Sequence, residues 1–174
     1  MNEPLRDPAA ELVEQVARTM AEPGSALALG AALRARAAGA PDALVLAALL
    51  HAAAGGADDP RVAAAWLGRS FGPAVSEPVR LLGDAERWLA TVDRSWFEAL
   101  DLAGLAALRA RGGPLGPVAL RSFERRPYAL DAARLVRWIA EERAGAPRPV
   151  GAGEPFHWAE LVRRVSGRDT RLTA

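Results

Sequence analysis

The stretch from Ala43 to Ala54, ALVLAALLHAAA, restricts the fold of this chain more than any other segment. Alanine and leucine favour the α-helix, and a helix built from this stretch is apolar on every side. Such a helix has to be buried, but the stretch is interrupted by His51 and is too short to cross a bilayer. The sequence therefore predicts a central helix that is enclosed by the other helices of its domain.

The rest of the chain also has the features of helix rather than strand. β-Branched residues are few, no stretch alternates apolar and polar side chains, and Asp-Pro pairs or glycine-rich turns separate the helical segments. We predict one helix within residues 1–24 and further helices over residues 25–39, 42–55, 60–71, 76–89, 93–100, 101–110, 117–123, 127–144 and 156–165. A length of 174 residues suits one globular domain. The predicted fold class is therefore all-α, with an N-terminal helix in 1–24, a core bundle in 25–144, and a connector and helix in 145–174.

Charge and composition exclude several classes of partner. The 22 basic and 21 acidic residues leave a net charge of +1, so no field of one sign attracts nucleic acid or an anionic membrane. Cysteine is absent, which excludes disulfides and thiolate chemistry. The first residues, MNEPLRDPAAELVEQ, lack the basic start and apolar centre of a signal peptide. We expect a cytoplasmic protein without nucleic-acid or membrane partners.

Three segments carry a resemblance to a known family. They read FGPAVSEPVRLLGDAERWLATVD, LRARGGPLGPVALRSFERRPYALDAARLVRW and HWAELVRRV. Together they resemble the small HD-domain oxygenases of organophosphonate catabolism and their close relatives, and the pattern extends from about Ser25 to Val165. The resemblance implies a single-domain HD-type helical bundle with a central cavity, in which His and Asp ligands hold two irons. It also implies a phosphonate substrate held by Lys, Ser and Arg.

At the family's metal-ligand positions, this chain has mostly lost the ligand residues. The positions fall, in chain order, on Leu27, His51, Ala52, Gly55, Asp59 (or its neighbour), Leu82 and Ile139. A pair of metal ions needs several imidazole and carboxylate groups around one cavity, whereas the whole chain has only two histidines. The resemblance, read with these substitutions, therefore implies no bound metal and no cofactor.

The anion-binding positions of the family are altered as well. Its Lys, Ser and Arg fall on Glu86, Ala107 and Val136, and a glutamate in place of lysine is expected to repel a phosphonate. The predicted lining of the former cavity is Leu27, His51, Ala52, Gly55, Leu82, Glu86, Ala107, Val136 and Ile139. The larger apolar residues would fill the cavity, and the alanines and glycine would leave room for a small apolar ligand. The sequence leaves both outcomes open.

His51, Asp59 and Glu86 are the candidate catalytic or ligand-binding groups. His51 could act as a lone general base, and its plainer interpretation is a buried histidine satisfied by a backbone carbonyl or by Asp59. Asp59 before Pro60 is typical of a helix cap, and Glu86 beside Arg87 is typical of an ordinary ion pair. The five tryptophans are expected to pack in the core rather than to form a ligand cage.

Three functions are compatible with this pattern. The first is a catalytically degenerate, metal-free HD-domain protein that acts by binding itself or a related HD-domain protein. The alternative is a metal-independent enzyme or small-molecule binder that reuses the apolar cavity, in a role suited to a specialised biosynthetic pathway. The third is a metal-dependent oxygenase or hydrolase that has survived with other ligands. Fold resemblance by itself does not choose among them.

Overall fold

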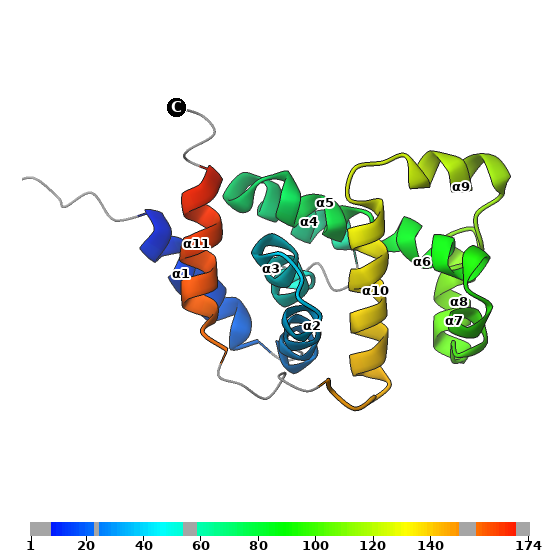
Figure 1. Cartoon of the computed structure of the whole chain (residues 1–174), viewed down its shortest axis with the longest axis horizontal. Helices are drawn as coiled ribbons and strands as arrows, with labels where there is room; N and C mark the ends of the chain where they lie inside the picture. Colours follow the sequence, from blue (N-terminus) through cyan, green and yellow to red (C-terminus); the bar gives the residue numbers. More distant parts are fainter. Residues whose placement is uncertain (1–7, 23–24, 54–58, 150–155, 170–174) are drawn as a thin grey trace, which may run out of the picture.

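The computed structural model describes residues 8–22, 25–53, 59–149 and 156–169, and these residues form helices without any strand (Figure 1). The helices are α1 (Pro8–Met20), α2 (Ser25–Ala37), α3 (Asp42–Leu50), α4 (Pro60–Phe71), α5 (Pro73–Arg80), α6 (Leu82–Val92), α7 (Arg94–Glu98), α8 (Leu102–Ala110), α9 (Pro117–Glu124), α10 (Ala129–Arg143) and α11 (Trp158–Asp169). This confirms the all-α fold class and is consistent with an HD-like bundle. None of these helices is long and apolar enough to pass through a membrane.

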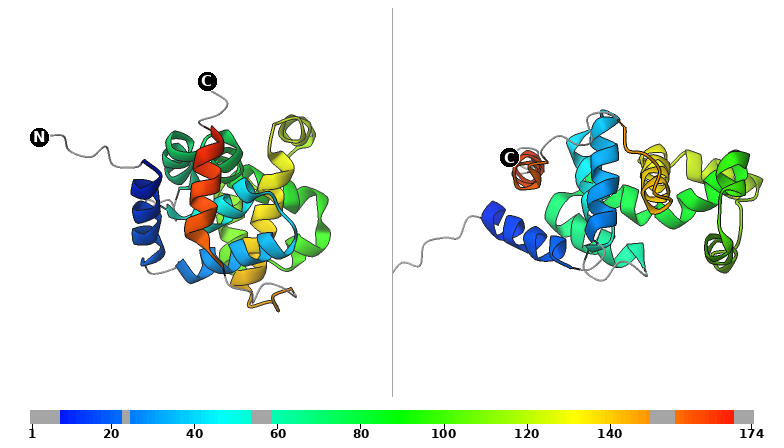
Figure 2. Two further views of the ribbon diagram at one scale, coloured as in Figure 1. Left: turned by 60° about the vertical axis from the view of Figure 1, so that its left-hand side comes forward. Right: turned by 90° about the horizontal axis from the view of Figure 1, so that it is seen from below.

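Helix α3 lies at the centre of the bundle, as its composition predicts. Every residue from Leu44 to Leu50 is buried, and α2, α5, α10 and α11 pack around them (Figure 1). Helices α1 and α11 pack against each other at one end of the molecule, and α6 to α9 lie at the other end (Figures 1 and 2). The first and last helices of the chain therefore build the same end of the bundle.

The central helix is shorter than its sequence predicts, because it ends at Leu50 rather than at Gly55. The side chain of His51 explains this end: its Nδ1 lies 2.8 Å from the carbonyl oxygen of Ala48. In a continued helix that carbonyl would accept the amide of Ala52, so the imidazole competes with the next helical hydrogen bond. Gly55 itself lies outside the described residues.

The helix predicted over residues 76–89 is divided in two. Helix α5 ends at Arg80, Leu81 forms the junction with φ −88° and ψ −1°, and α6 starts at Leu82. Pro78 lies inside α5, where it donates no amide hydrogen and its ring collides with the preceding turn. The backbone hydrogen bonds from Leu81 to Glu77 and from Ala85 to Leu81 continue across the junction, and α6 lies alongside α10 (Figure 1).

Helices α7 and α8 form a thinly packed wall at the outer end of the bundle. Of their residues, Leu108 alone is buried. Leu102 at the start of α8 is 86% exposed. Local unfolding is easiest where few apolar side chains are buried, so this wall is expected to open more readily than the helices around α3.

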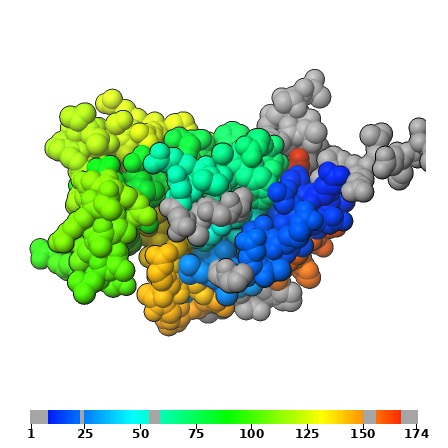
Figure 3. Space-filling model, turned by 180° about the vertical axis from the view of Figure 1, so that it is seen from behind, coloured from blue at the N-terminus to red at the C-terminus, as the bar shows by residue number. Residues whose placement is uncertain are grey.

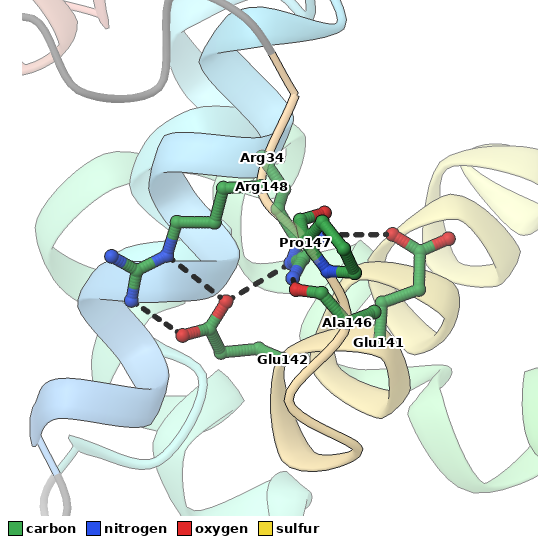
Figure 4. Close-up of polar contacts among 6 residues, drawn as sticks. All are labelled: Arg34, Glu141, Glu142, Ala146, Pro147 and Arg148. Atoms are coloured by element: carbon green, nitrogen blue, oxygen red, sulfur yellow. Dashed lines mark hydrogen bonds and ion pairs between the residues drawn. The ribbon is translucent and has the colours of Figure 1, made fainter.

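A buried arginine joins α2 to the C-terminal end of α10 (Figure 4). Arg34 is only 4% exposed, and its Nε donates to Oε2 of Glu142 at 3.0 Å. It also pairs with Glu141 and donates to the carbonyl oxygens of Ala146 and Pro147. Arg34 therefore links α2 to α10 and to the connector that follows it, in addition to the direct packing of the two helices.

Alanine substitution of the glycine inside α2 and of the glycine inside α4 is expected to change the free energy of unfolding in opposite directions. A Cβ on Gly30 would lie 2.2 Å from Cδ of Glu142, so Gly30→Ala has to displace a carboxylate that Arg34 and Arg148 hold. A Cβ on Gly68 meets only Ser76, at ordinary contact distances.

We expect Gly68→Ala to raise the free energy of unfolding by about 1 kcal/mol through helix propensity alone. We expect Gly30→Ala to lower the free energy of unfolding by about 1–2 kcal/mol. The loss from the disturbed charged hydrogen bonds of Glu142 is larger than the gain in helix propensity from alanine. Urea denaturation of both variants measures the two changes. Equal stabilisation by both would contradict the close approach of Glu142 to α2.

Candidate functional site

A cavity of about 250 Å³ lies between α6, α8 and α10, and the ends of α2 and α3 also contribute to it. It brings together eight of the nine positions that the sequence assigned to a cavity wall. They are Leu27, His51, Ala52, Leu82, Glu86, Ala107, Val136 and Ile139. The ninth, Gly55, lies outside the described residues. Figure 3 shows the face on which the C-terminal part of α10 (orange) lies between α2 (blue) and α8 (light green).

Several lining residues were missed from the sequence, although helical spacing could have identified them. Residues 136, 139, 140 and 143 of α10 recur at helical spacing, as do residues 104, 107, 108 and 111 at α8, and all of them line the cavity. Extending the predicted wall by one turn of each helix adds Arg143 and Arg111. Trp96, which packs against the core as expected, lines the cavity as well.

His51 is a neutral hydrogen-bonding group at the cavity wall. It is 8% exposed, and burial lowers the pKa of its imidazole; the hydrogen bond to Ala48 offsets this in part, and the charge of Arg143 lowers the pKa further. Because Nδ1 faces the Ala48 carbonyl, the neutral ring donates there and carries its lone pair on Nε2. No fully buried side-chain nitrogen or oxygen of the described residues lacks a partner, so Nε2, which has no partner among them, is not fully buried, and His51 lines the cavity.

Protonation of His51 is expected to destabilise the fold. Its folded pKa lies below the ordinary value of 6.5, so the unfolded chain takes up the proton first as the pH falls. Stability from the neutral His51 is therefore complete above about pH 6.5 and is lost as the pH falls toward the folded pKa.

Urea denaturation at several pH values tests this expectation. His51→Gln should flatten the pH dependence between about pH 5 and 7. His157, the only other histidine, is exposed, and His157→Gln is the matched control. An identical slope in the wild type and His51→Gln would show that His51 does not titrate differently on folding.

Glu86 lines the cavity and takes part in an ion pair, with Arg111 rather than with the neighbouring Arg87 as its partner. Arg111 pairs with its carboxylate, and the guanidinium of Arg143 lies within electrostatic range. Burial raises the pKa of Glu86, and the charges of Arg111 and Arg143 lower it in part. The cavity edge therefore carries two cations against one carboxylate, which corrects the expectation that an anion would be repelled here.

Asp59 does not line the cavity, contrary to the expectation that it offers a polar contact there. Its Oδ1 accepts the amide of Arg61 at 2.9 Å, so the carboxylate caps α4, as its place before Pro60 indicates. It lines a neighbouring groove of about 720 Å³, which shares Pro60, Gly83 and Arg111 with the cavity.

The arginines of this neighbouring groove already have partners. Arg61 pairs with Asp59 at 3.6 Å, and Arg126 pairs with Asp84 at 2.7 Å. Arg80 pairs with Glu77, Arg111 pairs with Glu86, and Arg87 donates to the carbonyl oxygen of Gly113 at 2.8 Å. Arg143 differs, because it makes no hydrogen bond or ion pair with any residue in the described part of the chain.

The donor set at the cavity does not fit a pair of metal ions. Among its lining residues, only His51 and Glu86 have side chains of the kind that bind iron, and Arg111 already neutralises Glu86. Within residues 8–22, 25–53, 59–149 and 156–169, no group of three or more His, Cys, Asp or Glu side chains could hold a metal ion. Hydrocarbon walls offer a cation nothing that replaces its hydration shell.

Comparison with known proteins supports a distant relation to the family that the sequence resembles. A segment of 68 residues, 39% of this chain, is 34% identical to hydroxymethylphosphonate dioxygenase from Gimesia maris. The matched segment covers 34% of that protein, so the similarity extends over only about a third of its length. No family model matches the chain. The similarity is consistent with an HD-like fold and is partial.

Proposed function

We propose that this chain is an HD-like protein that binds a small organic molecule, without a metal, in the cavity between α6, α8 and α10. The observation that carries the proposal is the volume of about 250 Å³ that remains at the positions where the resemblance places iron and substrate. Leu27, Leu82, Val136 and Ile139 form apolar walls without filling this space. This favours the small-molecule alternative over a fully packed core.

The size and chemistry of the cavity indicate the kind of molecule. An apolar cavity of about 150 Å³ holds benzene, so 250 Å³ has room for roughly ten non-hydrogen atoms. Apolar walls with a few polar groups are typical of small-molecule sites. His51 supplies a hydrogen-bond acceptor at Nε2, which is the group that a metal-independent reaction could use as a base.

The wall formed by α7 and α8 supports the same proposal. Trp96, Leu100 and Ala107 line the cavity from this side, while the wall buries little of its own surface elsewhere. A ligand in the cavity would contact this wall on one side and α10 on the other. Binding should therefore stabilise the weakest part of the bundle and raise the melting temperature.

Thermal unfolding of protein treated with a chelator tests the proposal. One-ring aromatic compounds and branched short-chain compounds, neutral and anionic, are added separately, and we expect some of them to raise the melting temperature in proportion to the logarithm of concentration. No stabilisation by any compound of this size would overturn the proposal. Elemental analysis of the untreated protein is the second measurement, and stoichiometric iron or manganese would favour a metal-dependent enzyme instead.

Association with a second copy or a related HD-domain chain stays a separate prediction. Large apolar side chains are exposed on the outer helices, among them Leu102 at 86%, Val118 at 75% and Leu130 at 65%. Sedimentation velocity of the wild type and of Leu102→Glu would detect self-association through α8. A monomer at every concentration would remove self-pairing as a function.

A further inference from the structure

We infer that the ligand is a small organic carboxylate with a single negative charge, held by Arg143 and Arg111 at the cavity edge with its hydrocarbon body against the apolar walls. The inference rests on the proposed function of the cavity and specifies its ligand class. It depends on the two arginines, which are placed there by the last turn of α10 and the end of α8.

The charges of the described residues that line the cavity do not balance. Arg111 and Arg143 each contribute one positive charge, and Glu86 contributes the only negative charge among the lining residues. His51 is neutral at pH 7, since burial and Arg143 keep its pKa low. One positive charge is therefore left over beside apolar walls, and one carboxylate would neutralise it.

Arg143 is the cation without a partner. It is exposed at the cavity edge, and no carboxylate or carbonyl in the described part of the chain pairs with it. Every arginine of the neighbouring groove, by contrast, already contacts an acid or a carbonyl. A guanidinium has five N–H donors in a fork that matches the two oxygens of a carboxylate. Arg111 has donors beyond the one that Glu86 uses.

The charge count also selects against a doubly charged ligand. A second negative charge would find no free cation in the cavity and would lie near the Glu86 carboxylate, which repels it. A phosphonate dianion is therefore a poorer match than a carboxylate of the same size. The apolar walls require that the rest of the ligand be hydrocarbon.

Isothermal titration with matched probes tests this inference. The probes are benzoate and phenylacetate, their neutral amides benzamide and phenylacetamide, and phenylphosphonate. We expect each carboxylate to bind about tenfold to a hundredfold more tightly than its amide, because a charged hydrogen bond is gained. Phenylphosphonate should bind more weakly than benzoate at a pH where it carries two charges.

A variant of Arg143 separates a direct contact from the general charge of the protein. Arg143→Met should remove most of the preference for carboxylate over amide. Arg109→Met removes the same charge from an exposed position of α8 that does not line the cavity, and it should leave the preference intact.

The outcomes distinguish this inference from the proposed function. Amides that bind as tightly as carboxylates would overturn the inference and leave small-molecule binding standing. Phenylphosphonate as the tightest ligand would overturn the single-charge assignment. If Arg109→Met and Arg143→Met lost the preference for carboxylate over amide equally, the proposed direct contact of Arg143 with the ligand would be overturned. Absence of binding in every arm would overturn the proposed function itself.

Discussion

Arg34→Met is expected to lower the free energy of unfolding by about 3 kcal/mol or more, the largest effect of any single substitution considered for this chain. The guanidinium is 4% exposed and joins α2 to two glutamates of α10 and to two carbonyl oxygens of the connector (Figure 4). Removing it leaves Glu142, which is 14% exposed, with Arg148 as its only cation. The two carbonyls lose a buried donor at the same time.

Urea denaturation of Arg34→Met and of Arg94→Met measures this effect against a matched control. Arg94 is 90% exposed and pairs with Glu98 at 2.7 Å, so its replacement should cost less than about 1 kcal/mol. Similar losses for the two variants would show that the buried contacts of Arg34 contribute no more than an exposed ion pair. Because Arg143 follows Glu142 directly, we also expect Arg34→Met to weaken carboxylate binding.

Ala107→Phe is expected to abolish ligand binding without unfolding the protein. The side chain of Ala107 points from α8 into the cavity, and a phenyl ring there would occupy the space that benzene needs, about 150 Å³ of the available 250 Å³. Filling an existing cavity adds apolar burial without displacing packed neighbours, so stability should stay equal or rise by about 1 kcal/mol. Titration with benzoate measures binding, and thermal unfolding measures stability.

Ala106→Phe is the matched control for this substitution. Ala106 is the preceding residue of α8 and is exposed, so the same ring there faces away from the cavity. Ala106→Phe should bind benzoate as the wild type does. Full binding by Ala107→Phe would show that the ligand occupies another place, for example the groove that shares Arg111 with the cavity.

The sequence predicted the helical content and the central helix because both depend on local properties. Residues 44–50 are apolar on all sides, so any fold that buries them places α3 in the middle. The positions of the cavity wall could also be predicted, from the resemblance, since Leu82 and Val136 lie in segments that carry it. The junction at Leu81 was missed because no glycine, proline or capping residue at that position marks a helix end.

What the amino-acid sequence determined by itself is the all-α class and the buried central helix. These follow from residue type and from spacing along one helix, which do not depend on distant contacts. The tertiary structure alone decided that Arg111 and Arg143, which are 32 residues apart, line the same cavity as Glu86, and that Asp59 caps a helix instead. Charges on different helices interact through space, so their sum at one site follows only from the packing.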